Sequence, residues 1–224
     1  MTANSDSLTT RLGALDSCAV SDALDSLGLP GTVTGLIRLA TNKRISGRVV
    51  TVELGLDKPV DQPVRHLCTG AIEAARTGDV IVVEQRTGID AAGWGGVLSN
   101  AAKRQGIAGV IVDGPARDID ESMALDFPVF ARSATAHTAR GRVHEQRFNG
   151  PIRVGNVSVH PGDLVIADAS AVVFIGGARA EEVVAVAERI VAKEVLMTRA
   201  VRDGQPVAQV MGADYEHMLG TPED

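Results

Sequence analysis

Residues 93–121 of this 224-residue chain read GWGGVLSNAAKRQGIAGVIVDGPARDIDE, and this stretch decides the fold. After the glycine turn at residues 93–96, apolar side chains recur at helical spacing, which predicts a helix. Residues 109–112 then form a short apolar run that begins with glycine, as is typical of a buried strand. The stretch therefore predicts a helix followed by a strand, a unit of α/β folds.

The predicted strand ends in the turn Asp113-Gly114-Pro115, which delivers Arg117 and Asp118 side by side. A helix N-terminus presents N–H groups without intrahelical partners, and these can hold a carboxylate. Arg117 offers a planar fork that binds a carboxylate through two hydrogen bonds, and Asp118 is a hard oxygen ligand for a divalent cation. If the strand returns beside the helix start, all these groups face one pocket. Such a pocket would suit a small 2-oxo acid that chelates a metal.

A structural explanation of the same residues stays open at this point. Asp118 and Glu121 have the spacing of a capping box, with Asp118 as the N-cap of a short helix. Arg117 would then be an ordinary surface arginine. An Arg-Asp pair alone does not decide between capping and metal binding.

Composition narrows the class of protein. The 224 residues suit one domain, predicted over residues 1–224, that buries roughly 70% of its unfolded surface. Aromatic residues make up only 3%, so the core is expected to consist of aliphatic side chains. The net charge of −6 argues against nucleic-acid binding, which needs a basic face. With no apolar run long enough to span a bilayer and no signal peptide in residues 1–10, we expect a cytoplasmic protein without membrane contact.

The order of the predicted elements indicates an α/β domain with a mixed sheet and no internal linker. Strands alternate with helices up to residue 130, then strands cluster, and helices close the chain. Residues 133–150 are polar and predicted as a loop with an extended segment. The last long helix is expected to bury a face that includes Val195. The predicted helices cover residues 8–27, 60–75, 97–102, 180–200 and 206–219, and the predicted strands cover residues 47–54, 80–84, 109–112, 126–130, 152–154, 164–167 and 172–175.

Other kinds of chemistry find little support. The glycines near residues 93–96 and 176–177 give neither a dinucleotide-binding fingerprint nor a phosphate-binding lysine, so no nucleotide cofactor is expected. Cys18 and Cys68 lack partners at zinc-site spacing and are interpreted as buried, reduced thiols. His137 and His144 fall in the polar stretch and are expected to be solvated.

Residues 94–118 resemble the core of the RraA-like family, which includes a regulator of ribonuclease activity and the 4-hydroxy-4-methyl-2-oxoglutarate aldolases. The shared pattern is a glycine, twenty residues, Arg-Asp, two residues and an acid, here Gly96, Arg117, Asp118 and Glu121. Further similar stretches are distributed along most of the chain, at residues 15–24, 161–168 and 201–204.

The resemblance implies a swivelling β/β/α architecture and assembly as a homotrimer or a dimer of trimers. It also implies that Arg117 binds the carboxylate and oxo group of the substrate. Asp118 would ligate Mg²⁺ or Mn²⁺. The substrate would lie against the backbone of Gly95, Gly96, Val97 and Leu98.

This chain departs from many aldolases of the family at Gly96, where they have an acid that positions a water. Glu121, Asp120 or Glu194 of the partner subunit could supply the missing carboxylate. Arg117 and Glu121 are the residues that we expect to act in catalysis.

Two hypotheses follow. The first is a divalent-metal-dependent lyase that acts on short 2-oxo acids by aldol cleavage, by oxaloacetate decarboxylation, or both, through a pyruvate enolate. The second is a non-catalytic regulator that binds a protein partner such as a ribonuclease. The Arg117-Asp118 pair favours the lyase, because a binding module has no need of a hard cation ligand beside an arginine.

Overall fold

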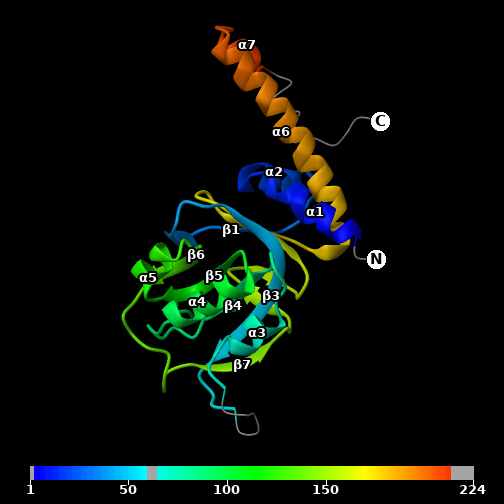
Figure 1. Cartoon of the computed structure of the whole chain (residues 1–224). Coiled ribbons are helices and arrows are strands. Elements are labelled where there is room, and N and C mark those ends of the chain that lie inside the picture. The colour runs from blue at the N-terminus through cyan, green and yellow to red at the C-terminus, as the bar shows by residue number, and fades with distance from the viewer. Residues whose placement is uncertain (1–2, 60–64, 213–224) are drawn as a thin grey trace.

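The computed structural model describes residues 3–59 and 65–212, which fold around a curled mixed sheet with helices on its outer faces (Figure 1). The strands are β1 (Thr32–Val33), β2 (Ile37–Ala40), β3 (Ile45–Gly55), β4 (Val80–Glu84), β5 (Gly109–Ala116), β6 (Val129–Ala134), β7 (His144–Phe148), β8 (Ile152–Val154), β9 (Val157–Val159), β10 (Leu164–Ala167) and β11 (Val172–Ile175). The helices are α1 (Ala3–Gly13), α2 (Ser17–Ser26), α3 (Thr69–Ala74), α4 (Gly96–Gln105), α5 (Ile119–Ala124), α6 (Ala180–Arg202) and α7 (Val207–Val210), with a 3-10 turn at Gly177–Arg179.

The long strand β3 joins two parts of the sheet. Residues 45–48 pair antiparallel with β10, whereas residues 49–53 pair parallel with β4. Beyond β4 the sheet continues in parallel through β5 and β6, and β2 closes that edge antiparallel. β7 pairs with the end of β3, and β8 and β9 form a separate hairpin. The sheet is therefore mixed, as the sequence predicts.

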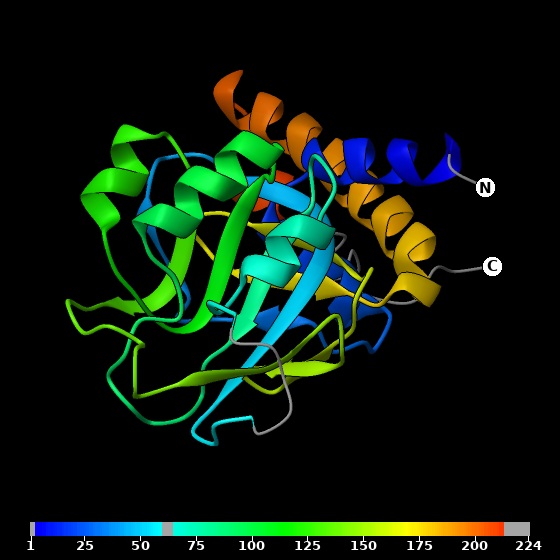
Figure 2. The same ribbon diagram turned by 60° about the horizontal axis from the view of Figure 1, so that its bottom comes forward.

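The parallel strands are buried on both faces, which explains why they are continuous aliphatic runs. On one face, α3, α4 and α5 cover the sheet, and their apolar residues share one core cluster with it (Figure 2). On the other face, β8, β9 and the inner residues of β10 and β11 complete a second cluster. Because both faces of the sheet are packed, the ends of β4 and β5 are held in place. The candidate site lies at the end of β5.

The terminal helices form a third packed region, because α1, α2 and α6 bury their apolar faces against β10 and β11. Only the first half of α6 takes part, through residues such as Val184 and Ile190. The predicted burial of Val195 is wrong, since 60% of this residue is exposed. Figure 1 shows the second half of α6 extending away from the sheet.

Three helix predictions need correction. The pattern at residues 8–27 forms two helices, because Asp16 has an extended backbone and its side chain caps α2 by accepting from the N–H of Ala19. Within residues 60–75 only α3 is helical, since Cys68 has a φ of 66° that no α-helix accepts. Residues 60–64 lie outside the described part of the chain. The final helix is the short α7, and the predicted extension beyond residue 212 also lies outside it.

The strand predicted at residues 126–130 begins later, at Val129, because Asp126 still has a left-handed backbone with a φ of 52°. β7 is the extended segment expected within residues 133–150. The turn at Gly162 has a positive φ of 87°, which glycine adopts without strain. Cys68 is buried as predicted, but Cys18 is exposed.

Candidate active site

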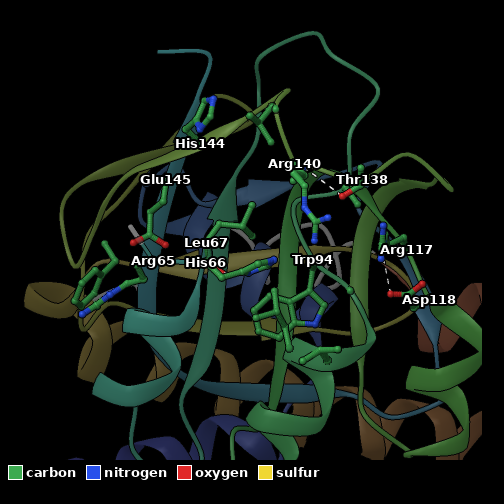
Figure 3. Close-up of a pocket in the computed structure, with 18 of the residues that line it drawn as sticks. Arg65, His66, Leu67, Trp94, Arg117, Asp118, Thr138, Arg140, His144 and Glu145 are labelled. Atoms are coloured by element: carbon green, nitrogen blue, oxygen red, sulfur yellow. Dashed lines mark hydrogen bonds and ion pairs between the residues drawn. The ribbon is translucent and has the colours of Figure 1, made fainter. Parts of the chain in front are cut away.

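A cavity of about 760 Å³ lies where β5 ends and α4 begins (Figure 3). One wall consists of the turn before α4 together with Arg117 and Asp118. The opposite wall comes from residues 138–148 and from the segment before α3. The cavity thus combines residues from parts of the chain that are far apart in sequence.

Backbone hydrogen bonds connect the glycine turn at residues 93–96 to the end of β5. The N–H of Gly93 donates to the carbonyl of Pro115 at 2.8 Å, and the N–H of Arg117 donates to the carbonyl of Trp94 at 3.0 Å. The strand therefore returns beside the helix start, which was the condition for a shared pocket, and the α4 N-terminus, Arg117 and Asp118 meet at one cavity.

Trp94 makes this corner rigid. Its indole Nε1 donates to Ser99 Oγ at 2.9 Å, and Ser99 Oγ is 2.9 Å from Ser122 Oγ. Its ring stacks on Phe127, with the ring centroids 6.3 Å apart. Because Trp94 is 1% exposed and held on two sides, the glycines that follow it have a fixed backbone.

Asp118 has a left-handed backbone, with φ 56° and ψ 43°, a conformation that is uncommon outside glycine. Its Oδ2 accepts from the N–H of Gly96 at 2.9 Å and from Arg117 Nε at 3.2 Å. The carboxylate does not cap α5, so the capping-box explanation is wrong, although Asp118 does hold the N-cap position. Within the described residues, Asp118 Oδ1 has no hydrogen-bond partner, and Asp118 lines the cavity.

Arg117 is oriented by the bond from its Nε to Asp118, which leaves its two terminal nitrogens without protein partners in the described chain. Its side chain is 38% exposed. The N–H groups of Val97 and Leu98 are likewise unpaired there, as expected in the first turn of a helix. Donors for an anion therefore come from both the side chain and the α4 backbone.

Glu121 lies directly against Gly96. A Cβ atom at position 96 would overlap with the carboxylate of Glu121, so the glycine makes room for this side chain. Asn100 Nδ2 holds the carboxylate at 2.7 Å and also donates to the carbonyl of Gly96 at 3.0 Å. Glu121 is thus near the turn, but it does not line the cavity itself.

Comparison with known proteins decides the family. A profile of the RraA-like family, described as Aldolase/RraA, matches residues 17–174. This chain belongs to the RraA-like family. The α/β class and the RraA-like architecture implied by the sequence resemblance are therefore confirmed.

Individual relatives of this RraA-like protein have different names. It is 32% identical over 194 residues to the "Putative 4-hydroxy-4-methyl-2-oxoglutarate aldolase" of Halalkalibacterium halodurans, covering 87% of this chain and 88% of that protein. It is 29% identical to Protein DlpA of Legionella pneumophila, covering 80% of this chain but only 30% of that longer protein. Among solved structures, it resembles Streptomyces coelicolor RraAS2, described as an unusual member of the RNase ES inhibitor RraA family. The TM-score is 0.75 at 26% identity, over 85% of this chain and 94% of that one.

The other two candidate acids do not join the site within one chain. Asp120 is exposed on α5 and does not line the cavity. Glu194 lies on α6, where burial and the nearby carboxylates of Asp16 and Asp22 raise its pKa. A role for Glu194 would require a second subunit.

The described residues contain no group of three or more His, Cys, Asp or Glu side chains that could hold a metal ion. Among the described residues that line the cavity, Asp118 is the acidic side chain on the wall of Arg117, and Glu145 lies on the opposite wall. This donor set fits Mg²⁺, which keeps several waters and commonly binds through one or two carboxylates together with substrate oxygens. No helix in the described part of the RraA-like chain is long and apolar enough to cross a membrane.

Sequence reasoning missed the wall opposite Arg117. Arg65, His66, Arg140, His144 and Glu145 line it, and several of them are labelled in Figure 3. His144 was expected to be solvated, but it lines the cavity. The high density of arginine and histidine in residues 133–150 is the feature of the sequence that could have indicated this wall.

Proposed function

We propose that this RraA-like protein is a divalent-metal-dependent carbon–carbon lyase acting on short 2-oxo acids. The reactions are aldol cleavage of 4-hydroxy-4-methyl-2-oxoglutarate-type substrates and decarboxylation of oxaloacetate. The observation that carries the proposal is the pairing of Arg117 and Asp118 beside the α4 N-terminus, where the Arg117 fork and Asp118 Oδ1 have no partners among the described residues. The relatives named as aldolases support the same class of reaction.

In this proposal, Arg117 binds the substrate's C1 carboxylate through its two terminal nitrogens. The free N–H groups of Val97 and Leu98 add donors and the positive end of the helix dipole. Since Trp94 fixes the glycine turn, these donors are preorganised, and the 2-oxo group is oriented toward Asp118.

Asp118 would hold Mg²⁺ or Mn²⁺ through Oδ1. When bound, the cation supplies Lewis acidity at the 2-oxo group, where negative charge develops. Asp118 Oδ2 stays bonded to the Gly96 N–H, so the carboxylate keeps its orientation while Oδ1 binds.

Both reactions break one carbon–carbon bond at C3 and leave its electron pair on the same three-carbon fragment. Aldol cleavage breaks C3–C4, and the 4-hydroxyl proton must leave as the new carbonyl forms. Decarboxylation of oxaloacetate breaks C3–C4 with loss of CO₂ and needs no base at that step. Each yields the enolate of pyruvate, which is then protonated at C3. One site can therefore support both reactions.

Glu121 is the proposed base for the 4-hydroxyl proton, acting through a water because it stands behind Gly96 rather than in the cavity wall. Asn100 holds its carboxylate in place. The Glu121 carboxylate occupies the space that an acidic side chain at position 96 would need. Glu121 can therefore take over the function of the acid that other family members have at that position.

The test is pyruvate release from 4-hydroxy-4-methyl-2-oxoglutarate and from oxaloacetate, with Mg²⁺ or Mn²⁺ and after addition of EDTA. We expect activity that the chelator abolishes. Arg117→Lys should raise KM roughly tenfold by losing the two-pronged contact, whereas the surface variant Arg104→Lys should match the unmodified protein. Activity that survives EDTA would contradict the metal mechanism.

The second candidate function is a regulator that binds a ribonuclease. Its support is the likeness to the Streptomyces coelicolor protein of the RNase ES inhibitor RraA family. If neither substrate releases pyruvate with any divalent cation, the regulator becomes the better explanation.

We also propose assembly as a homotrimer or a dimer of trimers, with Glu194 of the partner subunit near the cavity. The second half of α6, which extends away from the sheet, supports this proposal. Val195 and Leu196 on it are 60% and 67% exposed. Exposed aliphatic residues on a protruding helix suit a subunit interface. Analytical ultracentrifugation that shows a monomer at micromolar concentration would contradict this assembly.

A further inference from the structure

Arg140 is a cation in the cavity that the proposed chemistry at C1 and C2 does not use. It belongs to the wall opposite Arg117, and in Figure 3 its guanidinium extends into the space between Trp94 and Arg117. Within the described residues it has no ion pair and no side-chain hydrogen bond. A guanidinium directed into a cavity without a counter-charge is ready to bind an anion.

The turn that carries Arg140 is well ordered by its own contacts. The N–H of Val143 donates to the carbonyl of Ala139 at 3.0 Å, and Arg142 Nη1 donates to the carbonyl of Thr138 at 2.9 Å. Ala139 and Val143 are buried in the core cluster beneath the cavity. Arg140 is therefore presented from a fixed backbone rather than from a loose loop.

The charges around the cavity leave Arg140 unbalanced. Arg117 is partly neutralised by Asp118, and Arg147 pairs with Glu53 at 2.6 Å. The Glu145 carboxylate accepts the N–H of Cys68 at 2.6 Å. Each of these three side chains has a partner in the protein. Arg140 is exposed and has no ion pair among the described residues, so its guanidinium is available to an anionic group of a ligand.

We propose that Arg140 binds a second carboxylate of the substrate and so selects dicarboxylic 2-oxo acids over monocarboxylic ones. The inference rests on the proposed function in placing the first carboxylate at Arg117. In the aldol substrates the second carboxylate lies on the far side of the bond that breaks, and Arg140 holds the departing fragment. Arg140 is a specificity-determining residue and takes no part in proton transfer.

Two substrates that differ in one group test this role. 4-Hydroxy-2-oxoglutarate and 4-hydroxy-2-oxopentanoate undergo the same cleavage, but the second has a methyl group in place of the distal carboxylate. We expect Arg140→Gln to lower kcat/KM for the diacid by roughly 10- to 100-fold, mainly through KM, as for loss of a hydrogen bond to a charged group. The monoacid should change by less than about threefold, and Arg140→Lys should recover part of the loss.

A binding measurement keeps the inference separate from catalysis. Trp94 is the chain's single tryptophan and lines the cavity, so its fluorescence reports occupancy. With Mg²⁺ present, 2-oxoglutarate should bind more tightly than 2-oxopentanoate, and Arg140→Gln should remove that preference by weakening only the diacid. Arg153→Gln, an exposed arginine outside the cavity, is the charge-matched control and should behave like the unmodified protein.

The outcomes separate the two proposals. Selective weakening of the diacid in Arg140→Gln supports the inference even if no pyruvate is released, in which case only the lyase proposal fails. Equal affinity of the unmodified protein for both acids overturns the inference. So does an equal loss of both acids in Arg140→Gln, because that pattern indicates damage to the turn.

Discussion

Asp113 and Asp118 stand at opposite ends of one short segment, and their carboxylates have opposite surroundings. Asp113 is 5% exposed, and both of its oxygens are occupied, by Arg132 Nε at 2.7 Å and by the N–H of Gly155 at 2.7 Å. The Asp118 side chain is 38% exposed and lines the cavity, and its Oδ1 has no hydrogen-bond partner among the described residues.

The difference shows how to separate structural from functional acids in this fold. A carboxylate whose oxygens are all used inside the protein contributes to stability and has nothing left for a ligand. A carboxylate that is oriented by one oxygen and open at the other is prepared for binding. Asp118 also keeps an uncommon left-handed backbone, a local cost found at functional sites.

The largest expected effect is on activity at Asp118. Asp118→Asn tolerates the left-handed backbone and can still accept from the Gly96 N–H, but it removes the negative charge. We expect pyruvate release to fall on the order of 10³-fold, with the free energy of unfolding changed by less than about 1 kcal/mol. Steady-state assays and urea denaturation measure the two quantities. A variant that loses stability and keeps its activity per folded molecule would make Asp118 a structural residue like Asp113.

The converse prediction concerns Asp113. Asp113→Ala leaves Arg132 and the Gly155 N–H without their acceptor, so the protein should lose about 2–4 kcal/mol of unfolding free energy. Activity per folded molecule should remain within about threefold of the unmodified protein, because Asp113 does not line the cavity. Urea denaturation followed by circular dichroism gives the stability. A large loss of turnover without a loss of stability would erase the distinction between the two acids.

A smaller effect is expected at Glu121, and it should depend on the reaction. Glu121→Gln should slow aldol cleavage by about 10²-fold, the usual contribution of a general base, and decarboxylation by less than about threefold. Gly96→Asp should not add a second base, because its side chain would overlap with the Glu121 carboxylate and push it aside. Equal slowing of both reactions by Glu121→Gln would assign this residue to substrate binding or to structure.

The smallest expected effect is a pH-dependent change in the free energy of unfolding at Asp168, which, like Asp113, uses its carboxylate inside the protein. Burial would raise its pKa, but hydrogen bonds from Ser17 Oγ, from the N–H groups of Ser17 and Ser170, and from Ala171 together hold it below its usual value. A lowered folded-state pKa means that the stabilisation is complete above the unfolded pKa of about 3.9 and is lost as the pH falls through the folded value. Asp168→Ala should therefore cost about 1–2 kcal/mol at pH 7 and progressively less below about pH 4. A cost that stays constant down to pH 3 would show that charge plays no part.

The sequence predicts much of the pocket wall that contains Arg117. The apolar run of β5 and the glycines before α4 are local signals, and their meeting follows from the way consecutive helices and strands pack. The capping-box alternative used equally local spacing. It failed because the Asp118 carboxylate has a long-range partner, the Gly96 N–H, that spacing cannot reveal.

The opposite wall was not predicted, for two physical reasons. Apolar spacing before α3 imitates a helix up to residue 75, yet Cys68 takes a left-handed backbone whose N–H is held by Glu145. The segment that carries Arg140 is polar and has no period, so its turn depends on tertiary burial of Ala139 and Val143. Helical periodicity identifies the apolar face of α6 but does not show what packs against it. Val195 lies at an apolar position of that periodicity and is nevertheless exposed.

The most direct test of the central claim is Mn²⁺ binding, followed by calorimetry and by electron paramagnetic resonance, in the unmodified protein, Asp118→Asn and Glu121→Gln. We predict one Mn²⁺ site per chain, with an affinity that falls at least about tenfold in Asp118→Asn and is nearly unchanged in Glu121→Gln. Equal Mn²⁺ affinity in the unmodified protein and in Asp118→Asn would contradict it.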